Sequence, residues 1–143
     1  MIKITGQEQI VKTLNKLLFD MNRATIETVF AVANSVRNTA VLSIQNQSPG
    51  HVVARTRQGG SGTYEHMAAD RGNAPNTDTG NLVRSIAVEH KKGDTSAFVG
   101  TSVEYGAELE FGGWAWLEPA MDQHKSDVFI ELDRALTRQI EEV

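Results

Sequence analysis

Hydrophobic residues recur at steps of three and four from about Gln7 to Gln45, the spacing of one face of an α-helix. Thr5 and Glu8 have the spacing of a capping box, so Thr5 is the expected N-cap. The polar interval 20–25 leaves open either one helix or two shorter helices on one core. An unbroken helix would be about 55–60 Å long at about 1.5 Å per residue, too long for one small core. Part of it is then expected to pack against a neighbouring subunit. The apolar stripe consists of Ile10, Leu14, Leu17, Leu18, Met21, Val29, Ala33, Val36, Ala40 and Ile44.

Residues 47–77 are rich in glycine and contain two of the three prolines, with few apolar side chains. This composition predicts an extended loop, either throughout or with a short strand at 51–55. A loop of this length is typical of functional segments or of segments ordered by a partner. We therefore expect 47–77 to be largely unstructured in the free subunit. Its arginines, Arg55, Arg57 and Arg71, are either solvated or in contact with phosphates or with the acidic face of a neighbour.

The second half of the chain predicts a short helix, a hairpin and a long helix. Asp78 or Thr79 can cap a helix at about 80–85. Apolar alternation on both sides of Gly93 predicts a β-hairpin with strands at 85–89 and 96–101. From Pro119 the pattern is helical to the end of the chain, since proline is favoured in the first turn of a helix.

Together these elements predict one α+β domain over residues 1–143. A long N-terminal helix or helix pair (1–46) is followed by the extended loop (47–77). The short helix, a small antiparallel sheet built on the hairpin, and a connector occupy 78–117. A C-terminal helix (118–143) is expected to pack on the sheet.

The charge of the chain is unevenly distributed. The formal net charge is −4, with +3 over residues 1–103 and −7 over residues 104–143. This asymmetry indicates either head-to-tail contact between copies or a solvated acidic helix face. The 143 residues include no cysteine, which excludes disulfides, thiolate nucleophiles and cysteine-ligated zinc. No apolar run is long enough to cross a bilayer and no signal-peptide pattern is present, which fits a product assembled inside a cell.

Candidate enzyme chemistry is weak throughout the sequence. Asp78-Thr79-Gly80 matches the catalytic triplet of aspartic proteases, but no apolar strand precedes it. His66 and Asp70 have metal-ligand spacing only if their segment is helical, and it is rich in glycine. We therefore predict that the protein is not an enzyme and has no cofactor or metal site.

Large aromatic side chains gather between Val99 and Ala120, which contain both tryptophans. Such a concentration usually marks a place where elements meet. Trp114 and Trp116 are expected either to pack in the core under the C-terminal helix or to anchor a subunit interface.

Two stretches carry a family resemblance. The first is Pro75-x-x-Asp78-Thr-Gly80-x-Leu82-x-x-Ser85-Ile86. The second is Val99-Gly-Thr-x-Val103-x-Tyr105-x-x-x-Leu109-Glu110-Phe111-Gly112, followed by Leu117-x-Pro119-Ala120. In order and spacing they resemble the neck or tail-completion family of long-tailed double-stranded DNA phages, over residues 75–121. The family usually has Arg-Pro-Phe before the Leu-x-Pro-Ala step, where this chain has Trp114-Ala115-Trp116, so any contact of that arginine is absent here.

The resemblance implies a non-enzymatic virion protein, assembled in the bacterial cytoplasm. It would form a ring of six or twelve copies between the head-connector or head-closure protein and the tail terminator or tube protein, with double-stranded DNA passing through without sequence-specific contacts. Glu110, Phe111 and Gly112 would fix the turn between sheet and C-terminal helix. The alternatives are a tail-tube terminator and a small non-viral binding module. The motif residues expected to be structural are Asp78, Gly80, Leu82, Tyr105, Glu110, Phe111, Gly112 and Pro119. The candidate contacts to neighbours or to the lumen are Arg55, Arg57, Arg71, Trp114 and Trp116.

Overall fold

The first helix, α1 (Gln7–Gln45), runs without a break for 39 residues, so the alternative of two shorter helices is wrong. The computed structural model describes residues 6–57 and 59–143, and the cap expected at Thr5 lies outside them. The polar interval stays helical because ion pairs one turn apart, Lys16–Asp20 and Arg23–Glu27, bracket it. The remaining elements are β1 (Gly50–Thr56), β2 (Thr63–Ala69), α2 (Asn81–Ser85), β3 (Ala87–Glu89), β4 (Phe98–Gly100), α3 (Glu104–Gly112) and α4 (Glu118–Glu141).

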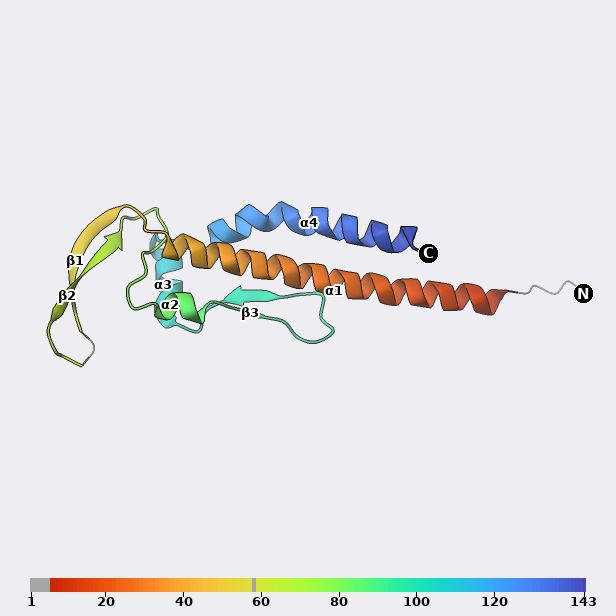
Figure 1. Ribbon diagram of the computed structural model, residues 1–143, viewed down its shortest axis with the longest axis horizontal. Coiled ribbons are helices and arrows are strands. Elements are labelled where there is room, and N and C mark those ends of the chain that lie inside the picture. The colour runs from red at the N-terminus through yellow and green to blue at the C-terminus, as the bar shows by residue number, and fades with distance from the viewer. Residues whose placement is uncertain (1–5, 58) are drawn as a thin grey trace, which may run out of the picture.

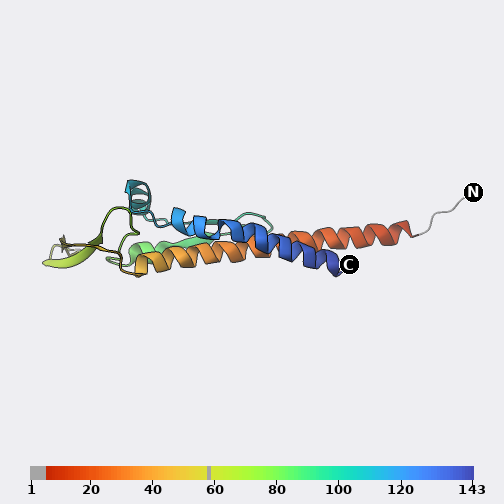
Figure 2. The same ribbon diagram turned by 90° about the horizontal axis from the view of Figure 1, so that it is seen from above.

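Two long helices dominate the architecture. α4 runs antiparallel to α1 along its C-terminal part, and the β3–β4 hairpin lies on another side of α1 (Figures 1 and 2). The core joins α1 to the elements around it through Val36, Ala40, Ile44, Leu82, Ile86, Trp116 and Ala120. The α+β fold class is therefore confirmed. Among the described residues, no helix is both long and apolar enough to cross a membrane.

One detail of the expected packing is different, because α4 lies on α1 and not on the sheet. Each strand of the β3–β4 hairpin has three residues, or about 10 Å of length, whereas a 24-residue helix is about 36 Å long. A sheet of that size cannot cover such a helix. Small residues such as Ala40 and Ala120, both nearly inaccessible to solvent, let the two helices approach closely.

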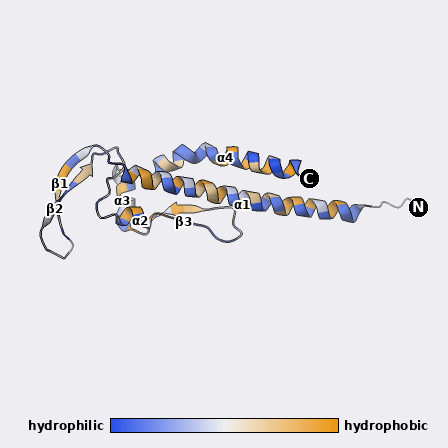
Figure 3. Ribbon diagram, viewed as in Figure 1, coloured by the Kyte–Doolittle hydropathy of each residue, from blue (hydrophilic) through white to orange (hydrophobic). Residues whose placement is uncertain are grey.

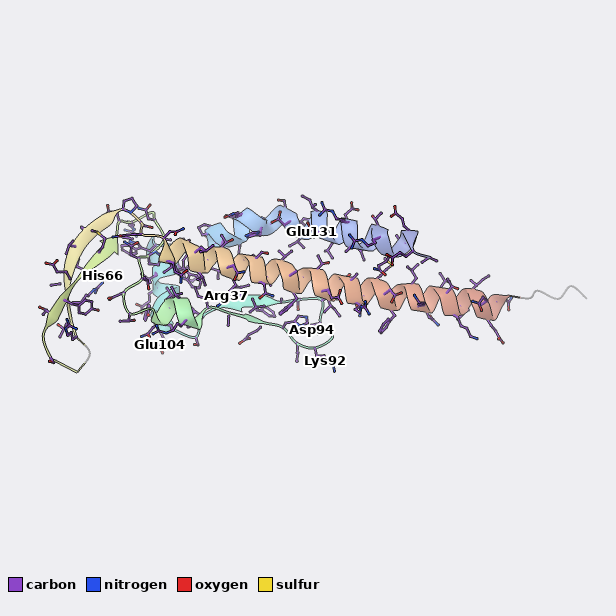
Figure 4. All side chains as sticks on the ribbon, viewed as in Figure 1. Arg37, His66, Lys92, Asp94, Glu104 and Glu131 are labelled. Carbon is purple, nitrogen blue, oxygen red and sulfur yellow. The ribbon has the colours of Figure 1, made fainter. Side chains whose placement is uncertain are left out.

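The β3–β4 hairpin lies where the sequence predicts it. Val88 pairs with Val99, and Gly93 has the positive φ that its turn requires. Its base is attached to α1 by Arg37, whose guanidinium Nε donates a hydrogen bond of 3.0 Å to the carbonyl of Ile86 (Figure 4).

The short strand considered at 51–55 is present as part of β1, but the extended loop expected over 47–77 is wrong, because β1 pairs with a further strand, β2, in an antiparallel hairpin. β1 and β2 pair over seven residues each, from Gly50 opposite Ala69 to Thr56 opposite Thr63. We call residues 50–69 the hairpin arm; it extends beyond the C-terminal end of α1 (Figure 1). Most of its side chains are exposed or half-buried, so its strands lack the regular apolar alternation of a core strand. Gly50 must be glycine here, because a Cβ would lie less than 2 Å from the Ala68 carbonyl oxygen.

Candidate functional site

A cleft of about 850 Å³ lies between the hairpin arm, the segment 75–82 and α3. It brings together residues that lie as far apart in the sequence as Ile44 and Trp114, including members of both motif stretches. The sequence-predicted residues that line it are Arg55, Asp78, Gly80, Leu82, Tyr105 and Trp114. The other predicted residues, Arg57, Arg71, Glu110, Phe111, Gly112, Trp116 and Pro119, are not among its lining residues.

One wall of the cleft is polar because of the register of the hairpin arm. Arg55 is paired with Tyr64, and His66 lies two residues further along β2 and so on the same face. The Tyr64 hydroxyl donates a hydrogen bond of 2.8 Å to an Asp78 carboxylate oxygen. His66 Nδ1 is 3.8 Å and Arg55 Nε 3.9 Å from the same carboxylate (His66 is labelled in Figure 4). Asp78 therefore accepts a hydrogen bond from the arm instead of capping α2, whose N-cap residue is Gly80.

Apolar side chains also line the cleft, among them Leu82, Leu109 and Trp114. A cleft lined by both apolar and charged side chains is suited to binding a partner that presents both kinds of group. The metal pairing considered for His66 and Asp70 is wrong in geometry, because Asp70 contacts His51 at 3.1 Å while His66 approaches Asp78. Within residues 6–57 and 59–143 no three His, Cys, Asp or Glu residues are grouped so as to hold a metal ion.

The hydrogen bond to Asp78 raises the pKa of the Tyr64 hydroxyl above its usual value of 10.0. Desolvation and the negative charge of Asp78 act in the same direction, whereas Arg55 and Arg57 oppose it. In a Tyr105→Phe background Tyr64 is the only tyrosine, so its ionisation can be followed by ultraviolet absorbance. Asp78→Ala should lower the titration midpoint towards 10.0, and Asp70→Ala, which alters a carboxylate not bonded to Tyr64, should leave it unchanged. Equal midpoints in the two variants would contradict this geometry.

Because the folded-state pKa of Tyr64 is raised, its stabilising hydrogen bond is fully present below about pH 10. The contribution is then lost as the pH rises through the folded-state value. Ionisation of Tyr64 therefore affects the protein only in alkaline solution.

Two residues that sequence reasoning missed hold the cleft in shape. The Asn76 side chain accepts a hydrogen bond from the Ser48 N–H and donates to the carbonyls of Ser48 and Met67. It thereby attaches the segment 75–82 to the base of the hairpin arm. Tyr64 is the second, through its bond to Asp78. Asparagine after proline indicates a turn, but no local signal shows that its amide bonds to a backbone 28 positions away.

Trp114 attaches the same base to the segment that joins α3 to α4. Its indole N–H donates to the Ala69 carbonyl at 2.8 Å, and the Arg71 guanidinium lies 5.9 Å from the centre of its ring. Trp116 is only 2% exposed and donates its indole N–H to the Gly106 carbonyl. Trp116 therefore packs in the core of the subunit, as expected in the first of the two interpretations, and does not anchor a subunit interface.

Glu110 forms the corner between α3 and α4. Its carboxylate accepts hydrogen bonds of 2.7–2.8 Å from the backbone N–H groups of Trp116, Leu117 and Glu118. Pro119, in the first turn of α4, has no N–H to satisfy. Phe111 is 89% exposed and points away from this corner's core. Gly112 is the last residue of α3, whereas Gly113 has the left-handed backbone, with φ of 111°, that ends the helix.

Substitution by alanine should have opposite effects on stability at the two adjacent glycines. Gly113→Ala should lower the free energy of unfolding by about 1–2 kcal/mol, because alanine is strained at positive φ. Its Cβ would also lie 2.3 Å from the movable Arg71 side chain. Gly112→Ala should be neutral or stabilise by up to about 1 kcal/mol, since it adds a helix former with contacts no shorter than 3.7 Å. Urea unfolding of both variants checks this prediction. A larger loss of unfolding free energy for Gly112→Ala than for Gly113→Ala would contradict it.

No protein-family model matches the chain, and comparisons with curated proteins and with solved structures give no match. The resemblance to the phage neck family therefore depends on the motif residues alone.

Proposed function

We propose that the protein is a structural, non-enzymatic subunit that assembles with copies of itself into a ring at the head-to-tail interface of a long-tailed phage. The observation that carries the proposal is the large apolar surface that one chain leaves uncovered. The accessible surface of the whole chain, polar and apolar together, is 10302 Å², whereas a compact monomer of 15.7 kDa has roughly 7,300 Å². The elongated subunit therefore exposes more surface than a compact one, and large apolar side chains lie on it, among them Ile10, Leu18 and Phe129, each more than half exposed.

The uncovered surface is concentrated on the two long helices. The N-terminal part of α1 extends past the end of α4 in both views, and apolar residues continue along it (Figures 1–3). Large apolar side chains there and on the outer side of α4 are exposed. Patches of this kind mark interaction surfaces in soluble proteins, because contact with water is unfavourable for them.

The motif residues support the neck assignment through what they do in the fold. Leu82 from the first stretch lies 3.1 Å from where a Cβ of Gly106 in the second would be, so the two stretches pack directly. A hydrogen bond between the Ser85 and Thr101 hydroxyls adds to this contact. Motif residues such as Leu82, Ser85 and Thr101 thus help to fix how α2 meets the start of α3, which is a structural reason for such a pattern.

The charges are compatible with a ring through which DNA passes. The net charge of −4 disfavours tight binding of the duplex, which would slow its passage. Arg55 and Arg57 on the exposed hairpin arm are placed for weak, sequence-independent phosphate contacts.

The test is a stop codon in this reading frame in the phage that carries it, with lysates viewed by negative-stain electron microscopy. Separate DNA-filled heads and tails are the expected result. Overlong or ragged tubes would identify a tail-tube terminator instead. Normal infectious particles would exclude both roles and favour a small binding module.

A further inference from the structure

The apolar stripe of α1 continues beyond the part that α4 covers. From the buried Ala24 it runs through Met21, Leu17 and Leu14 to Ile10 at helical spacing. No residue of the segment 7–20 is buried, and Leu18 is 64% exposed. The segment is therefore an amphipathic helix with an unoccupied apolar face.

α4 has a second unoccupied face. Phe129 and Ile140 are eleven residues apart, about three turns, and so lie on the same side of the helix. They are 73% and 58% exposed, while Ala120 and His124 face α1, the latter through a hydrogen bond to Thr39. The outer side of α4 thus has apolar side chains that its own α1 does not cover.

We propose that the segment 7–20 of one copy packs on the outer face of α4 of the next copy, around Phe129 and Ile140. This head-to-tail contact covers both faces at once, whereas a symmetric contact between two α1 segments would leave α4 uncovered. It deepens the proposed function and rests on it for ring closure, because repeated head-to-tail contacts form a ring when the rotation closes.

The charges favour this pairing over contact between two α4 helices. α4 carries six acidic and three basic residues, so two such helices face to face would repel each other. Residues 7–20 contain two acidic and two basic residues and have no net charge. The exposed apolar side chains of the segment 7–20 and of the outer side of α4 lie on different helices, so each subunit can make this contact once through each helix.

The absence of cysteine from the sequence makes cross-linking an unambiguous test. Leu14→Cys protein is mixed with Phe129→Cys protein of a different tag length, and the mixture is mildly oxidised. The expected product is a disulfide between the two different chains. Lys16→Cys is the matched control, because this lysine is exposed on the opposite face of the same segment and should give no such product with Phe129→Cys.

Two outcomes would overturn the inference. Disulfides between two Leu14→Cys chains in excess over mixed ones would indicate a symmetric contact. Equal mixed products from Leu14→Cys and Lys16→Cys would indicate random collision. As a second measurement, Leu18→Asp should weaken self-association at least about tenfold by light scattering, with unchanged helical circular dichroism, whereas Lys12→Asp on the exposed polar face should not.

The cross-linking result separates this contact from the neck role. Mixed disulfides together with normal particles from the stop-codon phage would support the contact and exclude the neck. Separate heads and tails without mixed disulfides would support the neck and exclude the contact.

Discussion

Trp116→Ala should lower the free energy of unfolding by about 3–5 kcal/mol, the usual cost of removing a large buried aromatic side chain. Trp116 is 2% exposed and belongs to the cluster that joins α1, α2 and α4. Its ring also touches α3, since its Cζ2 would be 3.6 Å from a Cβ at Gly106. Removing the Trp116 side chain leaves a cavity where four helices meet. None of these helices can move into the cavity without losing other contacts.

Phe111→Ala is the matched control, because Phe111 is a large aromatic residue only five positions away that is 89% exposed. It should change the stability by less than about 0.5 kcal/mol. Trp116→Phe keeps most of the packing but loses the bond to the Gly106 carbonyl, at a cost of about 1–2 kcal/mol. Unfolding should be measured at matched protein concentrations, because association shifts apparent stability. A loss below about 1 kcal/mol for Trp116→Ala would contradict its place in the core.

The parts of the fold that were predictable have strong periodic signals. The stripe of α1, the proline at the start of α4 and the alternation around Gly93 each indicate an element that the structure contains. Where the apolar residues are buried, as at Val36, Ala40 and Ile44 of α1, burial leaves its period in the sequence.

The second strand of the hairpin arm was missed because the arm buries little. β1 has exposed residues on both faces and β2 has one buried residue, Ala69, so no regular apolar alternation is imposed, and nearby glycines indicated a loop. Three of those glycines, Gly59, Gly60 and Gly62, have positive φ and lie between β1 and β2. The turn glycines and the β-branched Val52 and Val53 are therefore signals of a hairpin, although its strands lack the regular alternation of a half-buried sheet.

The cleft was not predictable as a unit. Its residues come from the arm, the segment 75–82 and α3, and no spacing in the sequence shows that they converge. The motif resemblance did single out Asp78, Leu82 and Tyr105, which all line it. It also singled out Gly112, whereas the left-handed backbone belongs to its neighbour Gly113, a distinction that only the dihedral angles reveal.

Glu110→Ala should lower the free energy of unfolding by about 2–3 kcal/mol, more than the loss of an ordinary helix cap. The Glu110 carboxylate accepts three backbone hydrogen bonds at the start of α4, and the residue at the N-cap position, Leu117, has no side chain able to replace it. A negative charge there is also favourable because the N-terminal end of a helix is electropositive. Without the carboxylate, the N–H groups of Trp116 and Leu117 would be partly buried and unpaired.

Glu108→Ala is the matched control, since Glu108 is an exposed glutamate of the same helix without such bonds to α4, and it should change stability by less than about 0.5 kcal/mol. Glu110→Gln keeps one acceptor oxygen but replaces the other with a donor, so it should recover only part of the loss. Amide hydrogen exchange gives the local measurement: residues 116–118 should exchange faster in Glu110→Ala, while the centre of α1 should follow only the global change. If Glu108→Ala and Glu110→Ala were equally stable, the corner between α3 and α4 would have to be held by packing around Trp116 alone.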